Sequence, residues 1–201
     1  MFSPLEMLRP TIKARTDMDM RQVDPLHADS GPAAWPSQIH AVLQGLQIRQ
    51  VAYVPDAGHA RLIQLCEQDP AMVTTVLTTE EEGIALATGA WLGGQLGVVL
   101  MQSSGVGNCI NMLSLVQACR VPLAMIVTMR GEWGEFNPWQ IPMGSTTCES
   151  LKLAGVATHR VESEKDAAET VEVAFRTAID TQTAVAVVLS QRMLGRKKWT
   201  R

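Results

Sequence analysis

The stretch TTEEEGIALATGAWLGGQLGVVLMQSSGVGN, residues 78–108, is the most informative part of this 201-residue chain. Three consecutive glutamates open a run rich in alanine and glycine, which predicts a helix with an acidic first turn. The next run, LGVVLMQ at 96–102, is apolar throughout and has the length of a buried strand. Residues 103–108, SSGVGN, contain two glycines and predict a loop where that strand ends.

Strand-like and helix-like segments alternate on both sides of this stretch. Further apolar or β-branched runs of strand length are residues 51–55, 72–78, 122–129, 156–161 and 184–190. Helical patterns mark residues 37–50, 60–68, 109–120, 147–155 and 163–181. Apolar strands separated by helices are typical of a parallel sheet covered on both faces. We therefore predict the α/β class, with a doubly wound parallel sheet of about six strands and helices on both faces.

Composition and charge exclude several classes of protein. With 46% hydrophobic residues the chain can bury a core, and a net charge of −3 gives no electrostatic basis for binding nucleic acid. No apolar run is long enough to span a membrane, and the N-terminus lacks the apolar segment of a secretory signal. The four cysteines have no metal-binding spacing, which favours free thiols in a reducing compartment. We expect a cytoplasmic protein with no metal site of its own.

Three regions are expected along the chain. Residues 1–33 are rich in Pro, Asp and Met and predict an irregular N-terminal arm. Residues 34–192 hold the alternating strands and helices of the predicted domain. Residues 193–201 form a basic tail, which fits either a solvated terminus or a contact with another subunit.

Polar and glycine-rich residues gather where the predicted strands end. These segments are PDAG at 55–58, TTEEE at 78–82, QSSGVGN at 102–108 and RGEWGE at 130–135. Ligands of open parallel sheets bind at the carboxyl ends of the strands. We therefore expect the functional site at this edge of the sheet.

The three glutamates admit a purely structural interpretation. Thr78 with Glu81, and Thr79 with Glu82, both fit a capping box, and acids in a first turn stabilise a helix by roughly 0.3–1 kcal/mol each. This interpretation does not explain the small residues that follow, because glycine within a helix costs about 1 kcal/mol relative to alanine. A face for close helix packing, such as one at a subunit interface, would explain them; its residues are Gly83, Ala85, Ala87, Gly89 and Ala90.

Residues 78–115 resemble the pyrimidine-binding (PYR) domain of thiamine diphosphate enzymes. In that family a glutamate at a helix start stands nine residues before a glycine, and a strand and an S-G-x-G loop follow. Here the glycine is Gly89, which selects Glu80, and the loop is residues 104–107 followed by Asn108. The runs VVLMQ and VPLAMIVTMRGEWGE look closest to the sulfopyruvate and phosphonopyruvate decarboxylase branch. The resemblance extends over residues 36–191.

The resemblance implies that Glu80 is catalytic. A carboxylate hydrogen-bonded to the aminopyrimidine ring of thiamine diphosphate favours its imino tautomer, which activates the cofactor toward a 2-keto acid. Glu81 and Glu82 are then helix-start residues. The resemblance also implies that the glycine loop approaches the cofactor, and the candidate binding residues are Gln102, Ser103, Ser104, Gly105, Gly107 and Asn108.

The same loop fits a dinucleotide-binding fingerprint in part, because it follows a strand and precedes a predicted helix. Ile110 occupies the position of the third glycine, which argues against NAD. Gln102, Ser103 and Asn108 also fit ordinary hydrogen bonding within a loop.

The resemblance further implies a second chain. Thiamine enzymes hold the cofactor diphosphate and Mg²⁺ with a PP domain that carries a Gly-Asp-Gly motif and a downstream Asn, and this sequence contains no Gly-Asp-Gly. We expect the PYR (α) subunit of a heteromeric 2-keto-acid decarboxylase that is inactive without a PP-domain (β) partner. The alternative is a non-catalytic binding or regulatory protein that keeps the fold. A nucleotide-binding α/β protein is a third hypothesis.

Candidates for contact with the 2-keto acid lie in segments that follow other predicted strands. They are His59, Arg130 and Gln140, with Trp133 nearby. A cation such as Arg130 suits a sulfonate or phosphonate group, although it also fits an ion pair with Glu132 or Glu135. His27, His40 and His159 have no ligand partner at useful spacing.

Aromatic residues make the segment after Arg130 more apolar than an anionic substrate requires. They are Trp133, Phe136 and Trp139. They leave room for an apolar 2-keto acid, and they equally fit packing against a partner chain.

Overall fold

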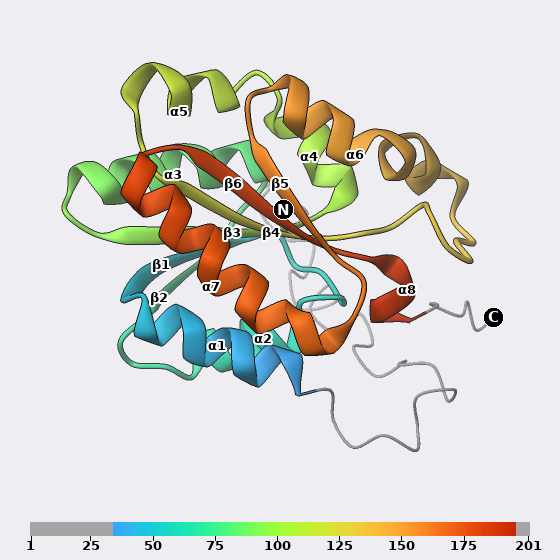
Figure 1. Ribbon diagram of the computed structural model, residues 1–201, viewed down its shortest axis with the longest axis horizontal. Coiled ribbons are helices and arrows are strands. Elements are labelled where there is room, and N and C mark those ends of the chain that lie inside the picture. Colours follow the sequence, from blue (N-terminus) through green and yellow to red (C-terminus); the bar gives the residue numbers. More distant parts are fainter. Residues whose placement is uncertain (1–33, 196–201) are drawn as a thin grey trace, which may run out of the picture.

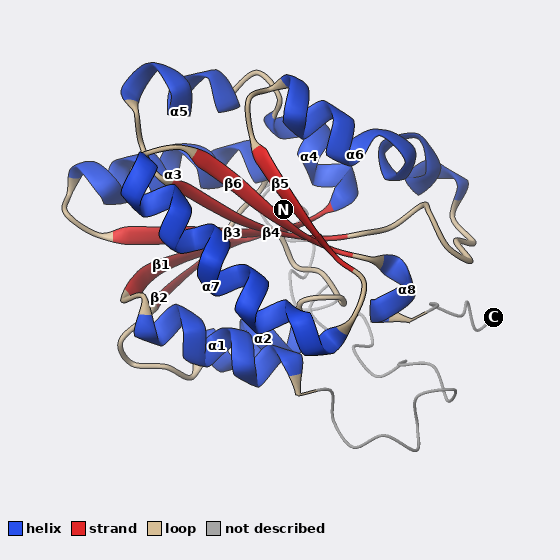
Figure 2. Ribbon diagram, viewed as in Figure 1, coloured by secondary structure: helices blue, strands red, loops and turns tan. Residues whose placement is uncertain are grey.

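The computed structural model describes residues 34–195, and its ribbon is shown in Figures 1 and 2. The strands are β1 (Ile48–Tyr53), β2 (Val73–Val76), β3 (Leu96–Gln102), β4 (Leu123–Thr128), β5 (Ala157–Val161) and β6 (Ala184–Leu189). The helices are α1 (Trp35–Gly45), α2 (Ala60–Glu67), α3 (Glu80–Leu92), α4 (Ser103–Cys109), α5 (Leu113–Cys119), the 3-10 turn η4 (Pro138–Gln140), α6 (Ile141–Leu153), α7 (Glu164–Thr181) and α8 (Gln191–Leu194). The N-terminal arm predicted at 1–33 and most of the basic tail lie outside the described residues.

The strands form one six-stranded sheet in the order β2-β1-β3-β4-β6-β5, and every pairing is parallel. The central strands β4 and β6 are buried along their whole length, as their continuous apolar sequences predict. The predicted fold class is therefore confirmed. The strand order reverses between β1 and β3, and this is the position at which open parallel sheets bind ligands.

Two apolar cores lie on the two faces of the sheet (Figure 1). On one face, α1, α2 and α7 bury Ile39, Leu62 and Phe175 against the strands. On the other face, α3, α4, α5 and α6 bury a second cluster, in which Ile84 and Leu113 have no exposed surface above 1%. Both layers thus hold the sheet rigid and leave its carboxyl edge open for polar side chains.

Several local predictions were wrong, among them the start of the helix predicted at 147–155, which is α6 and begins at Ile141. Residues 48–50 belong to β1 and not to the preceding helix, because Gln47 adopts a positive φ of 56° that ends α1. Residues 103–109 form α4 and not a loop, and the predicted helix 109–120 is interrupted at residues 110–112. Val106 and Cys109 lie one helical turn apart and are both fully buried, so core packing favours a helix despite the two glycines.

The small residues of α3 serve close packing within the chain. A Cβ added to Gly83 would lie 2.8 Å from a methyl group of Val99 on β3, and one added to Gly97 would lie 3.4 Å from the Cα of Ala87. The helix therefore approaches the sheet closely at this face. Ala85 and Gly89 point away from the sheet and are exposed, so only part of the predicted face is explained by contacts among residues 34–195.

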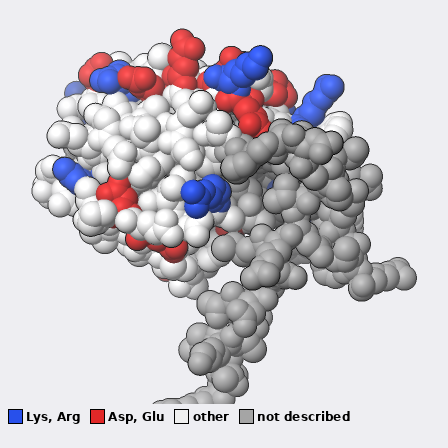
Figure 3. All heavy atoms as spheres, turned by 90° about the horizontal axis from the view of Figure 1, so that it is seen from below, with Lys and Arg blue, Asp and Glu red and all other residues white. Residues whose placement is uncertain are grey.

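The length and polarity of the helices, and the charged side chains on the surface, bear on contact with membranes and other molecules. Within residues 34–195 no helix combines the length and apolar character that a bilayer crossing requires. On the face shown in Figure 3, acidic and basic side chains lie near one another between broad uncharged areas.

Candidate functional site at the carboxyl edge of the sheet

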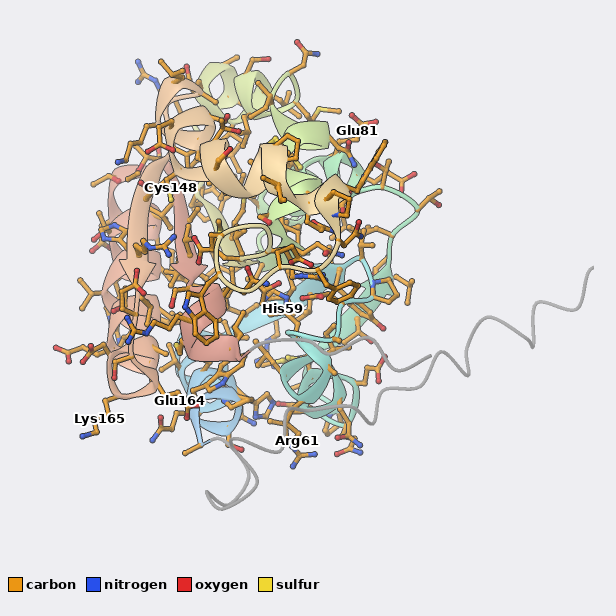
Figure 4. The ribbon with its side chains drawn as sticks, turned by 90° about the vertical axis from the view of Figure 1, so that its right-hand side faces the viewer. His59, Arg61, Glu81, Cys148, Glu164 and Lys165 are labelled. Carbon is orange, nitrogen blue, oxygen red and sulfur yellow. The ribbon has the colours of Figure 1, made fainter. Side chains whose placement is uncertain are left out.

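The side chains singled out in the sequence come from segments that follow different strands at one edge of the sheet. Glu80 begins α3 after β2, and His59 precedes α2 after β1. Gln102 ends β3, and Arg130 follows β4. Figure 4 looks onto this edge and shows His59 near its centre, with Glu81 at the start of α3 above it.

Glu80 is buried and hydrogen-bonded at the start of α3. Its side chain is 7% exposed, and its Oε2 accepts a hydrogen bond of 2.8 Å from Nδ2 of Asn108. A Cβ added to Gly105 would lie within 2.4 Å of Cδ, Cγ and Oε1 of Glu80, so only glycine allows the carboxyl group to rest on α4. Oε1 of Glu80 accepts no hydrogen bond from any of residues 34–195. One carboxylate oxygen is thus anchored, and the other is available to a ligand.

The other two glutamates are placed differently. Glu82 forms the capping box with Thr79, and its Oε2 accepts the backbone N–H of Thr78 at 2.8 Å. Glu81 is exposed. Of the three, only Glu80 therefore turns its carboxylate toward α4.

Cys109 lies on α4 near the two acidic side chains Glu80 and Glu81. Burial, with a smaller contribution from the charges of these two glutamates, raises the pKa of the Cys109 thiol to about 12. The thiol therefore stays protonated at neutral pH and is a poor nucleophile.

The first residues of α4 have mixed roles. Ser103 is fully buried, and its Oγ accepts the backbone N–H of Arg130 at 3.0 Å, so it ties the end of β3 to the end of β4. Ser104 is half-buried and Gly107 is exposed. A Cβ added to Gly107 would meet the sulfur of Met143 at 3.3 Å, which marks a close approach of α4 and α6.

Gln140 brings an unsatisfied polar atom to the same edge. Its side chain is 8% exposed, and its Nε2 donates to Oε1 of Gln102 at 3.3 Å. Its Oε1 is buried and has no hydrogen-bond partner among the described residues. Buried polar atoms in proteins almost always have a partner, so this carbonyl oxygen is a candidate for a ligand contact.

His59 is fully buried and also has unsatisfied ring nitrogens. Its Nδ1 lies 3.5 Å from Oδ2 of Asp56, beyond a good hydrogen bond, and neither nitrogen has a hydrogen-bond partner within residues 34–195. Asp56 in turn accepts a short hydrogen bond of 2.5 Å from Oγ1 of Thr128 at the end of β4. A Cβ on Gly58 would lie 2.8 Å from Asp56 Oδ2, so glycine is required where these residues meet.

Arg130 is committed to an ion pair. Its Nε and Nη2 both donate to the carboxylate of Glu135 at 2.7 Å, and the two side chains are only 11% and 3% exposed. Of the two partners considered from the sequence, Glu135 is the one observed, and the pair is buried. Glu132 instead pairs with Arg160 at 2.8 Å.

Glu135 is held in its ionised form. Burial acts to raise its pKa, but hydrogen bonds from Arg130 and from the backbone of Asn137 and Gly131 outweigh that effect and lower the pKa to about 2. Sequence reasoning treated Glu135 only as a surface partner. It also missed Gln191, whose side chain is buried and donates to Glu135 at 2.9 Å.

Aromatic side chains line the outer side of the same segment. Trp133, Phe136 and Trp139 are 46%, 40% and 82% exposed. The Arg130 guanidinium lies 5.7 Å from the centre of the Phe136 ring, a cation–π distance.

The remaining histidines lie elsewhere. His40 contacts Asp69 at 3.1 Å on the α1 side, and His159 is exposed on β5. His27 lies outside the described residues. Residues 34–195 contain no group of three or more His, Cys, Asp or Glu that could hold a metal ion.

Comparison with known proteins shows to which family this chain belongs. The chain is 34% identical over 152 residues to the sulfopyruvate decarboxylase subunit alpha of Methanothermobacter thermautotrophicus, covering 75% of this chain and 92% of the relative. It belongs to the sulfopyruvate decarboxylase alpha-subunit family. The subunit alpha of Methanocaldococcus jannaschii is 33% identical over 130 residues, covering 64% of this chain and 77% of that relative.

This chain also matches part of a longer enzyme. The phosphonopyruvate decarboxylase of Streptomyces viridochromogenes is 38% identical over 141 residues, which are 69% of this chain but 36% of that enzyme. A sulfopyruvate decarboxylase alpha-like chain therefore corresponds to about a third of the phosphonopyruvate enzyme. The resemblance predicted from residues 78–115 is confirmed. No protein-family model matches the chain.

The fold also matches a solved structure. It superposes with a TM-score of 0.62 on the 2-oxoglutarate:ferredoxin oxidoreductase from Magnetococcus marinus, at 13% identity, covering 80% of this chain and 29% of that one. At this identity the match bears on the fold of this chain alone.

Proposed function

We propose that this chain is the PYR (α) subunit of a heteromeric thiamine diphosphate-dependent 2-keto-acid decarboxylase, and that Glu80 activates the cofactor. The observation that carries the proposal is the Glu80 carboxylate, which is buried and anchored by Asn108, and whose second oxygen has no hydrogen-bond partner among residues 34–195. Membership in the sulfopyruvate decarboxylase alpha-subunit family supports the reaction class.

The residues at this edge fit an aminopyrimidine ring. Gly105 has no side chain at the point where the Glu80 carboxyl group rests against α4, so Glu80 can hold its position at this edge. The candidate binding residues are the sequence neighbours of Gly105 at the end of β3 and in α4: Gln102, Ser103, Ser104, Gly107 and Asn108. In the proposal Gln102, Ser104 and Gly107 line the ring. Ser103 holds the ends of β3 and β4 together, and Asn108 keeps the Glu80 carboxylate in place.

Glu80 is the residue that moves a proton in this proposal. Its Oε1, which no residue within 34–195 engages, would hold a proton between the carboxylate and a ring nitrogen of the bound cofactor, and a charge-assisted bond in a site shielded from water is strong. When bound, thiamine diphosphate supplies a thiazolium group that accepts the electron pair released as a 2-keto acid loses carbon dioxide. In the proposal Gln140 and His59 offer buried polar atoms to the substrate.

A second chain completes the site. The sequence has no Gly-Asp-Gly motif, and the described residues have no metal cluster, so the diphosphate and its Mg²⁺ are assigned to a PP-domain (β) partner. The name "subunit alpha" of the relatives supports a heteromeric enzyme. The substrate class is a 2-keto acid, with sulfopyruvate and phosphonopyruvate as the first compounds to try.

The test is reconstitution with a PP-domain chain that carries Gly-Asp-Gly and a downstream Asn. Carbon dioxide release from a panel of 2-keto acids is measured with wild type, Glu80→Gln and Glu81→Gln. We expect activity only with both chains, a loss of about 100-fold or more for Glu80→Gln, and no loss for the exposed neighbour Glu81→Gln. Full activity of Glu80→Gln would refute the catalytic role. No activity with any 2-keto acid would favour a non-catalytic binding or regulatory protein.

A further inference from the structure

The segment between β4 and α6, residues 130–140, is folded around the carboxylate of Glu135. Oε2 of Glu135 accepts Arg130 Nε at 2.7 Å, the Gly131 backbone at 3.1 Å and Gln191 Nε2 at 2.9 Å. Oε1 accepts Arg130 Nη2 at 2.7 Å and the Asn137 backbone at 3.0 Å. A single carboxylate therefore joins the start of the segment, its middle and the end of β6.

Gln191 fixes the segment from the other side. It follows β6 and is 2% exposed. Its Oε1 accepts the backbone N–H groups of Glu132 at 3.0 Å and Trp133 at 2.9 Å, while its Nε2 donates to Glu135. Because both ends of the amide are in use, its orientation is determined by the contacts. We call Arg130, Glu135 and Gln191 the anchor group.

The backbone of Arg130 and Gly131, which the anchor group holds, lies directly against the backbone of Gln140 and Gly144. A Cβ added to Gly131 would lie 2.1 Å from the carbonyl oxygen of Gln140, and one added to Gly144 would lie 2.2 Å from the carbonyl oxygen of Arg130. The two ends of the segment are therefore in backbone contact. A shift of Arg130 and Gly131 would move Gln140, and with it the buried Oε1 that has no hydrogen-bond partner among residues 34–195.

The Arg130 guanidinium is already paired with the Glu135 carboxylate. Two nitrogens of its guanidinium form the parallel pair of bonds to Glu135, the strongest arrangement that arginine makes with a carboxylate. Removing one partner of a buried pair leaves an uncompensated charge, which is strongly destabilising. Freeing Arg130 for an anionic ligand would therefore disrupt the segment.

We propose that Glu135 and Gln191 are positioning residues: they hold residues 130–140 so that Gln140 stays at the site, and they commit Arg130 to the segment instead of to a substrate anion. The consequence for catalysis rests on the function proposed above. The consequence for the order of the segment does not.

The first experiment measures hydrogen exchange of residues 131–137 in the full chain. The variants are Glu135→Gln, Gln191→Ala and Arg130→Lys. We expect at least about a tenfold faster exchange in each, because the backbone amides of Gly131, Glu132, Trp133 and Asn137 lose their acceptors or their anchored partners. Gln191→Ala removes no charged side chain, so it remains informative if Glu135→Gln does not fold.

The second experiment measures kcat and KM of the reconstituted complex with sulfopyruvate and with pyruvate, which lacks the sulfonate. A positioning role predicts that each variant lowers kcat/KM by a similar factor for both substrates. It also predicts that Arg130→Lys is as poor as Arg130→Met, since lysine keeps the charge but not the paired geometry. A matched control is Arg176→Met, which breaks the exposed pair with Glu172 on α7 and should change neither measurement.

A different set of results would show that Arg130 binds the substrate. If Arg130→Met raises KM for sulfopyruvate alone, Arg130→Lys restores it, and exchange of residues 131–137 is unchanged, Arg130 binds the substrate anion and the inference is wrong. A wild-type complex that decarboxylates no 2-keto acid would refute the proposed function instead. The exchange measurement would still decide the role of the anchor group.

Discussion

At the scale of single residues, helix geometry gives three adjacent glutamates different roles. Successive side chains of a helix point about 100° apart, so the three cannot share one environment. Glu80 turns toward α4, Glu81 points to solvent, and Glu82 folds back to cap α3. The capping pattern in the sequence predicted the role of Glu82, while only the family resemblance distinguished Glu80 from Glu81.

Gly105→Ala tests whether the position of the Glu80 carboxylate matters. The added methyl group would overlap the Glu80 side chain, which must turn away, while alanine is favourable in a helix by about 1 kcal/mol relative to glycine. We expect a folded chain with little change in melting temperature and a loss of activity of about 100-fold or more in the reconstituted complex.

Gly89→Ala is the matched control on α3. A Cβ at this position meets nothing within 4 Å in the described chain, so the same substitution should stabilise the helix by roughly 0.5–1 kcal/mol. Equal activity of the Gly105→Ala variant and wild type would show that the overlap with Glu80 has no consequence. Reduced activity of the Gly89→Ala variant, with a stable fold, would instead place a partner on this face of α3.

At the scale of elements, the segment after β4 depends on one ionised carboxylate. The pKa of Glu135 is about 2 in the folded chain, below its ordinary value of 4.5. A lowered pKa stabilises the fold above pH 4.5, and this stabilisation is lost as pH falls from 4.5 toward 2. Glu135→Gln should therefore lose less stability than wild type over this interval.

Urea unfolding at pH 6, 4.5 and 3 measures this difference. We expect the free energies of unfolding of wild type and Glu135→Gln to converge as the pH falls, with the largest separation at pH 6. Glu172→Gln, in an exposed pair, should follow wild type across the series. A constant separation between Glu135→Gln and wild type would contradict the ionised state of Glu135.

The sequence predicted most elements and missed features that depend on distant partners. Apolar runs located the sheet strands, but residues 103–108 were predicted to be a loop because their glycines suggested a turn. Those glycines are instead needed for contacts with Glu80 on α3 and Met143 on α6. Local propensity carries no signal for such contacts.

At the scale of the whole molecule, the strand order explains where the candidate site lies. The reversal between β1 and β3 brings together the segments that carry His59, Gln102 and Glu80, which are separated along the chain. The pattern of strand ends predicted this edge as the site. It could not predict Gln191, because its bonds to Glu135 join positions 56 residues apart and glutamine after a strand is unremarkable in sequence.

The family comparison and the exposed aromatic residues both bear on assembly. The chain matches 92% of a protein named as a subunit and only 36% of the longer phosphonopyruvate decarboxylase. Trp139, which is 82% exposed, lies next to Gln140 at the site. A PP-domain partner that closes over the carboxyl edge would cover it, so assembly should lower the solvent exposure of this tryptophan, measurable by fluorescence quenching. Unchanged quenching in an active complex would place the partner elsewhere.

The central claim is that Glu80 activates thiamine diphosphate, and it can be tested without knowing the substrate. The measurement is the rate at which the proton on the reactive thiazolium carbon exchanges with deuterium in the assembled complex. We predict that Glu80→Gln slows this exchange by about 100-fold or more, while Glu81→Gln leaves it at the wild-type rate. Exchange at the wild-type rate in a Glu80→Gln complex that still binds the cofactor would contradict the claim.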